Sequence, residues 1–138
     1  MDQYSMFDYI YEPFKITKPI RLIEFFAGYG SQTLALKYLG VNFEHWKTCE
    51  WAVKSIQAYK DIHFPNDNTD YSKDLNVDEI VQYLFKKGIS SNYNEPMNES
   101  QIKRLSEEEL RRIYNNIQAT HNLVNIQEAG GSNLIFKI

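Results

Sequence analysis

The chain has 138 residues, of which 43% are hydrophobic and 24% are charged, a composition that excludes a disordered protein and predicts one soluble domain. Its net charge of −3 excludes strong binding to nucleic acid by this chain alone, because phosphate contacts need clustered Lys and Arg. No apolar run is long enough to cross a bilayer, and the amino terminus lacks the basic and apolar segments of a secretory leader. We therefore expect a cytoplasmic location.

The amino-terminal residues 1–19 are rich in aromatic and acidic side chains but keep no regular hydrophobic period. We interpret them as an arm that packs on the domain through its apolar side chains, which are Phe7, Tyr9, Ile10 and Phe14. Residues 20–138 form the domain itself. Its first part, residues 20–65, is predicted to form a strand, a glycine turn, a helix, a second strand and a second helix, the order that opens an alternating α/β sheet.

The first predicted strand, residues 20–26, is nearly continuously apolar, as is typical of a parallel strand covered on both faces. It ends at a turn where Gly28 and Gly30 permit positive φ and leave no Cβ to hold a ligand away from the backbone. A helix is predicted over residues 31–39, with apolar side chains facing inward at Leu34, Ala35, Tyr38 and Leu39. Free amides at the start of this helix suit a carboxylate or phosphate. The alternative is a tight turn that binds nothing.

The second predicted strand, residues 41–50, ends at an acid, Glu50, twenty positions after Gly30. An acid in this place can accept hydrogen bonds from ribose hydroxyls. A dinucleotide fingerprint needs a glycine or alanine three residues after Gly30, where this chain has Thr33. Thr33 therefore disfavours a nucleotide-dependent oxidoreductase.

Two further helices are predicted in a helical insertion at about residues 74–121. The first follows an apolar stripe over residues 77–85 and stops at Gly88. The second begins at a capping box formed by Ser106 and Glu109, after a polar segment that separates the two helices. Both helices are interpreted as structural.

Two short motifs resemble the first two motifs of the DNA cytosine-5 methyltransferases, most closely those of phage and bacterial members. They are Phe26-Ala27-Gly28-Tyr29-Gly30-Ser31 and Glu50-Trp51. The resemblance implies an α/β class: a partial Rossmann-like, S-adenosylmethionine-dependent methyltransferase fold with a mostly parallel sheet, flanking helices and a helical insertion. It also implies that the glycine turn wraps the methionine part of S-adenosylmethionine, that Glu50 binds the ribose and that Trp51 packs on the adenine.

A third motif of the family, an aspartate followed by an aliphatic residue at the end of the next strand, contacts the adenine amino group. The candidates are Asp70-Tyr71 and, after the helical insertion, Asn133-Leu134. We favour Asn133 as the cofactor-binding residue, because the third strand would then follow the second insertion helix. An asparagine side chain can still bond an amino group.

Members of the family attack cytosine with the thiolate of a Pro-Cys motif, and this sequence has no Pro-Cys pair. The only cysteine, Cys49, lies beside Glu50 inside the second strand, which predicts a buried structural thiol. A single cysteine also cannot form an internal disulfide, as fits a reducing compartment. We assign no catalytic residue and no metal ligand, and the region that reads DNA is missing from this sequence too.

Two functions from different classes fit these features. The first is the S-adenosylmethionine-binding amino-terminal portion of a DNA cytosine-5 methyltransferase, inactive alone and dependent on a complementary chain for methyl transfer. The second is a non-catalytic interaction module derived from that portion, of phage or mobile-element origin. The resemblance implies a central first strand whose second neighbour this sequence does not supply, so we expect a homodimer or a complementary methyltransferase chain to cover it. DNA would be contacted only through a completed enzyme, and no membrane is expected as a partner.

Overall fold

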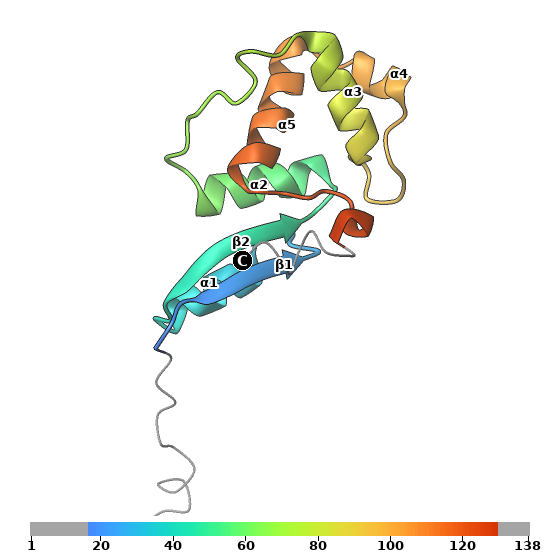
Figure 1. Cartoon of the computed structure of the whole chain (residues 1–138). Helices are drawn as coiled ribbons and strands as arrows, with labels where there is room; N and C mark the ends of the chain where they lie inside the picture. Colours follow the sequence, from blue (N-terminus) through green and yellow to red (C-terminus); the bar gives the residue numbers. More distant parts are fainter. Residues whose placement is uncertain (1–16, 130–138) are drawn as a thin grey trace, which may run out of the picture.

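The computed structural model describes residues 17–129. Most of the predicted arm and the predicted cofactor residue Asn133 lie outside the described residues. A small sheet with helix α1 against it occupies one end of the molecule, and helices α3, α4 and α5 occupy the other (Figure 1). Helix α2 lies between these two groups.

The sheet is built from two parallel strands, β1 (Ile20–Phe25) and β2 (Phe43–Cys49). Their register runs from Ile20 opposite Phe43 to Phe25 opposite Cys49, with one irregularity after Leu22. Helix α1 (Ser31–Tyr38) connects the strands, so this part forms a βαβ unit. Parallel pairing with flanking helices confirms the predicted α/β class.

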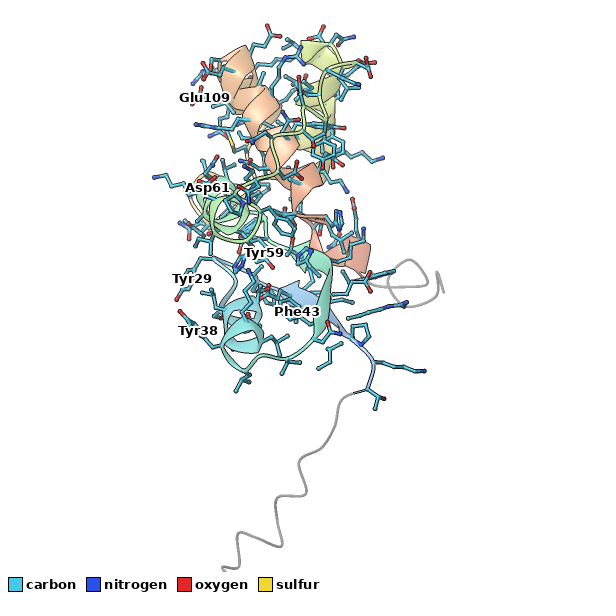
Figure 2. All side chains as sticks on the ribbon, turned by 90° about the vertical axis from the view of Figure 1, so that its left-hand side faces the viewer. Tyr29, Tyr38, Phe43, Tyr59, Asp61 and Glu109 are labelled. Atoms are coloured by element: carbon cyan, nitrogen blue, oxygen red, sulfur yellow. The ribbon has the colours of Figure 1, made fainter. Side chains whose placement is uncertain are left out.

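The predicted inward face of α1 is wrong for three of its four residues, and only Leu34 is half-buried. Tyr38 and Leu39 are 87% and 75% exposed, Ala35 is also exposed, and the buried residue of the helix is Thr33. Figure 2 shows Tyr38 directed away from the rest of the molecule. Nothing in residues 17–129 covers the outer side of α1, which packs mainly on β1. The apolar pattern correctly predicts a helix here, but most of its side chains do not face the described core.

The hydrophobic core lies mainly among the later helices: α2 (Val53–His63), α3 (Val77–Lys87), α4 (Glu99–Lys103) and α5 (Glu107–Ala119). A short 3₁₀ helix, η1 (Ile126–Ala129), follows them. The largest fully buried apolar side chains of this core are Ile56, Ile80, Leu84, Ile89, Ile102, Leu110 and Ile117. None of the helices described within residues 17–129 has the length and hydropathy needed to span a bilayer.

Local capping explains where the helices after α2 begin. The predicted box of Ser106 and Glu109 starts α5, and the predicted stop at Gly88 ends α3 with φ 73°. Helix α4 was not predicted, although Asn98 and Gln101 form the same kind of box before it. These reciprocal bonds satisfy amides that a helix start otherwise leaves free.

Candidate cofactor site

A cavity of about 550 Å³ opens beyond the carboxyl ends of the two parallel strands. This edge is where open α/β sheets usually bind their ligands. Three of the predicted residues line it: Phe26, Glu50 and Trp51. Five predicted residues continue the turn after Phe26 without lining the cavity: Ala27, Gly28, Tyr29, Gly30 and Ser31. The two sequence motifs therefore meet at one place.

Glu50 joins the two motifs directly. It follows β2 and is 9% exposed. One carboxylate oxygen accepts a hydrogen bond from the Gly28 amide at 2.9 Å, and the other accepts one from the Ala52 amide, also at 2.9 Å. An ionised carboxylate has about four acceptor positions, so each oxygen can still accept a ligand hydroxyl.

The two glycines of the turn differ in what surrounds them. Gly28 has φ 52°, and a Cβ built on it would meet nothing within 4 Å. Gly30 has φ 84°, and its Cβ would lie 2.7 Å from Cε2 of Tyr59 and even closer to Nε2 of His63. Gly30 is thus required by the packing of α2, whereas the space beside Gly28 is open to a ligand.

A buried acid beneath the turn fixes its position. Glu24 of β1 is 2% exposed and accepts hydrogen bonds from the Thr33 amide at 3.0 Å and the Thr33 hydroxyl at 2.6 Å. The Tyr59 hydroxyl of α2 donates to the same carboxylate. Burial and this bond to Glu24 raise the pKa of Tyr59, so the phenol stays a donor. Glu24 was not among the predicted site residues, although an acid inside an apolar strand was the available signal.

Cys49 lies in the wall of the cavity but is not a nucleophile. Its side chain is buried, and Sγ lies 3.6 Å from the carbonyl oxygen of Val124. Burial, together with the neighbouring Glu50 charge, raises the pKa of the thiol to about 11. The thiol is therefore protonated at neutral pH, which confirms the predicted buried thiol.

The chain returns to β2 immediately after α5. Asn122 forms a parallel bridge with Thr48, and the Leu123 amide donates to the Thr48 carbonyl at 2.9 Å. The Asn122 side chain accepts from the Glu50 amide at 3.1 Å and donates to the Glu50 carbonyl at 2.9 Å. The segment that begins at Asn122 therefore takes the place expected for a third strand.

This return brings Asn125 and Ile126 into the cavity wall. Their order resembles that of the third motif, an aspartate followed by an aliphatic residue, with asparagine in place of the aspartate. The pair predicted from the sequence, Asn133-Leu134, lies outside the described residues. An asparagine followed by an aliphatic residue soon after the second insertion helix was the signal available for Asn125.

No protein-family profile matches the chain. The chain is 33% identical to the orphan methyltransferase M.SssI of Spiroplasma monobiae (strain ATCC 33825 / MQ-1) over 111 residues, which is 80% of this chain. The aligned region covers 29% of that relative. The similarity extends well beyond the two motifs at the cavity.

Proposed function

Because the chain is related to the cytosine methyltransferase family, as its motifs predicted, we propose that it forms the S-adenosylmethionine-binding part of a DNA cytosine-5 methyltransferase. One observation carries this proposal: the Glu50 carboxylate is bonded to the Gly28 amide at the mouth of the cavity that Trp51 lines. An acid, an aromatic ring and open backbone thereby meet at one edge of the sheet.

The chemistry of these groups fits the three parts of the cofactor. Glu50 would accept hydrogen bonds from the ribose hydroxyls, and Trp51 would pack on the adenine. Asn125 would bond the adenine amino group through its side-chain oxygen. The open backbone beside Gly28 and the start of α1 would receive the methionine carboxylate.

The chain would bind and orient the cofactor without attacking the base. When bound, the cofactor supplies an activated methyl group. Cys49 is the only cysteine of the sequence, and it is buried with a raised pKa. A thiolate for attack on cytosine would thus come from a Pro-Cys segment outside these 138 residues, together with the groups that read DNA.

Calorimetric titration with S-adenosylmethionine and S-adenosylhomocysteine tests the cofactor site. We expect binding by the unmodified chain, and Glu50→Ala should weaken it by about 1–3 kcal/mol because a buried hydrogen-bonded acid is lost. Glu44→Ala is the matched control, since Glu44 is an exposed acid on β2. Absence of binding at millimolar cofactor by a folded chain would contradict the proposal.

A transfer assay tests the missing nucleophile. The purified chain, unmethylated DNA and S-adenosylmethionine labelled on the methyl group should give no labelled cytosine. Addition of a chain that carries a Pro-Cys motif should be required for transfer. Cytosine methylation by the chain alone that survives Cys49→Ser would show that another residue is the nucleophile.

A second candidate function, the non-catalytic interaction module, is supported by exposed apolar side chains at the end of β1 and on α1. Phe26 is 78% exposed, and Phe25, Tyr38 and Leu39 are exposed as well. Strand β1 pairs with β2 on one side, and within residues 17–129 no strand pairs with its other side. An apolar surface beside an open strand edge favours a second chain as partner. Strong association without cofactor binding would favour this function over the first.

A further inference from the structure

The helical insertion reaches the cavity through the segment between α3 and α4. The Ser90 amide donates to the Trp51 carbonyl at 2.8 Å, and the Val53 amide donates to the Ser90 carbonyl at 2.9 Å. These bonds form a parallel bridge between Ala52 and Ser90. The insertion is therefore joined to the backbone on both sides of Ala52, directly after the predicted ribose acid Glu50.

Ser90 also shapes the loop that follows it. Its side chain is fully buried; Oγ accepts a hydrogen bond from the Tyr93 amide at 3.0 Å and donates one to the Glu95 carbonyl at 2.7 Å. Tyr93 is held at φ 67°, a left-handed conformation that is uncommon for an aromatic residue. The loop thus has a defined shape that presents this one side chain.

The Tyr93 ring is placed at the cavity and is not used in the core. It lines the cavity together with Trp51, and the residue is 53% exposed. Its hydroxyl bonds Oγ of Ser55 on α2 at 3.1 Å. A tyrosine fixed at its polar tip, with much of its surface free, is suited to stack on a flat ligand.

We propose that Tyr93 is a cofactor-binding residue that contacts the adenine nucleoside, so that the helical insertion completes the cofactor site. This inference rests on the proposed function of the cavity. The loop of Tyr93 is bonded to the segment of Trp51, the predicted adenine-packing residue. Among residues 17–129, no hydrogen bond joins this loop to the glycine turn that is predicted to hold the methionine part. The contact therefore belongs to the nucleoside end of the ligand.

Calorimetric titration of the whole chain with S-adenosylhomocysteine and with adenosine tests this assignment. Tyr93→Gly removes the ring, and glycine accepts the positive φ. The variant should weaken the binding of both ligands by a similar factor, roughly five- to a hundred-fold for a lost stacking contact. Tyr93→Phe keeps the ring and should bind within about threefold of the unmodified chain. Tyr38→Ala is the control, because Tyr38 is an exposed tyrosine of α1 outside the cavity wall.

The outcomes separate this inference from the proposed function. If Tyr93→Gly binds both ligands as the unmodified chain does while Glu50→Ala weakens them, the role of Tyr93 is overturned and the cofactor site stands. Weaker binding of S-adenosylhomocysteine with unchanged binding of adenosine would also overturn it, by placing the contact at the amino-acid end of the ligand. If Tyr93→Gly loosens the fold, Tyr93→Asn gives the same test, because asparagine also tolerates left-handed backbone.

Discussion

At the scale of single residues, Gly28 and Gly30 share a backbone conformation but not a surrounding. Both have positive φ, yet only Gly30 is packed against α2, through Tyr59 and His63. The sequence motif predicts that both glycines leave space for a ligand beside the backbone. The structure separates them into one that the fold needs and one beside which space remains.

The paired substitutions Gly28→Ala and Gly30→Ala test this difference. Each adds backbone strain of about 1–2 kcal/mol, and Gly30→Ala should cost a further ~1–3 kcal/mol because the new methyl group overlaps packed side chains. Gly28→Ala should instead weaken the binding of S-adenosylmethionine, since the methyl group of the new alanine enters the open space. Urea denaturation and calorimetry measure the two effects, and equal losses of stability would contradict the assignment.

His45 of β2 is a second residue whose burial affects the stability of the fold. Both ring nitrogens are buried and have no hydrogen-bond partner among the described residues. The ring packs edge-on against Phe64, with Tyr59 and His121 nearby. Burial, and then the His121 charge, lower the pKa of His45 from 6.5 to about 4.

A lowered histidine pKa makes the fold sensitive to acid. Between pH 6.5 and 4 the unfolded chain binds a proton at His45 that the folded chain does not, so the free energy of unfolding falls as the pH falls. His45→Phe keeps a ring of similar size and removes this titration. Urea denaturation at several pH values should show a steeper fall for the unmodified chain than for the variant, and parallel curves would contradict the argument.

At the scale of elements, sequence signals within a single helix were sufficient to predict α3 and α5. Their apolar stripes and caps lie within a dozen or so residues, and the predicted starts and the stop at Gly88 are confirmed. The signal for α4 was equally local and was missed because five residues, Glu99–Lys103, hold too short a stripe to recognise. The face of α1 could not be predicted, because the apolar pattern does not say what covers it.

The residues that line the cavity divide in the same way. Short motifs predicted that Phe26, Glu50 and Trp51 lie together, and the structure places them beside the ends of two adjacent parallel strands. Asn125 and Tyr93 line the same cavity but were not predicted there. For Asn125 a local signal was available in the aliphatic residue that follows it, whereas the place of Tyr93 depends on bonds between segments more than thirty residues apart in the chain, about which sequence spacing carries no information.

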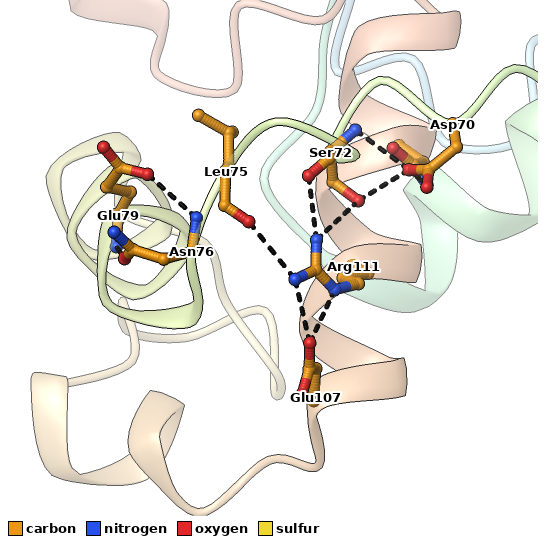
Figure 3. A network of polar contacts seen from close by, with 8 residues as sticks. Asp70, Ser72, Leu75, Asn76, Glu79, Glu107 and Arg111 are labelled. Carbon is orange, nitrogen blue, oxygen red and sulfur yellow. Dashed lines mark hydrogen bonds and ion pairs between the residues drawn. The ribbon is translucent and has the colours of Figure 1, made fainter.

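Arg111 shows how one side chain connects two elements. From α5 it donates to the Ser72 carbonyl at 2.8 Å and to the Leu75 carbonyl at 3.2 Å, and it pairs with Glu107 one turn earlier (Figure 3). Asp70 accepts from the Ser72 hydroxyl in the same network. The turn that leads into α3 is thereby fixed to α5.

Arg111→Met should lower the free energy of unfolding by about 1–3 kcal/mol, because part-buried carbonyl groups lose their donor. Arg112→Met is the matched control: it changes the adjacent, exposed arginine and should have an effect within about 0.5 kcal/mol. Urea denaturation of both variants gives the comparison. Equal effects would mean that the network in Figure 3 adds no stability beyond that of a surface charge.

At the scale of the whole molecule, the sheet is the least complete part. Its two strands leave one side of β1 without a paired strand in the described part of the chain. Ile20 and Phe25 of β1 are exposed, as is the outer face of α1. We propose that a second copy or a complementary chain pairs along β1.

Light scattering with size-exclusion chromatography tests this association. We expect a homodimer, or a stable complex with a complementary methyltransferase chain. Phe25→Lys should weaken it by placing a charge at the contact, whereas Phe85→Lys, at an exposed phenylalanine of α3, should not. A monodisperse monomer at high concentration, with freely exchanging amides over residues 22–26, would contradict the prediction.

The bridge between Ala52 and Ser90 has a consequence for the lifetime of the protein. Because it ties the insertion to the wall of the cavity, a cofactor bound as proposed would stabilise the form in which this bridge is intact. A ligand at a hundred times its dissociation constant adds about 2.7 kcal/mol to the stability of the closed form. The chain would then resist proteases longer at high than at low cofactor concentration.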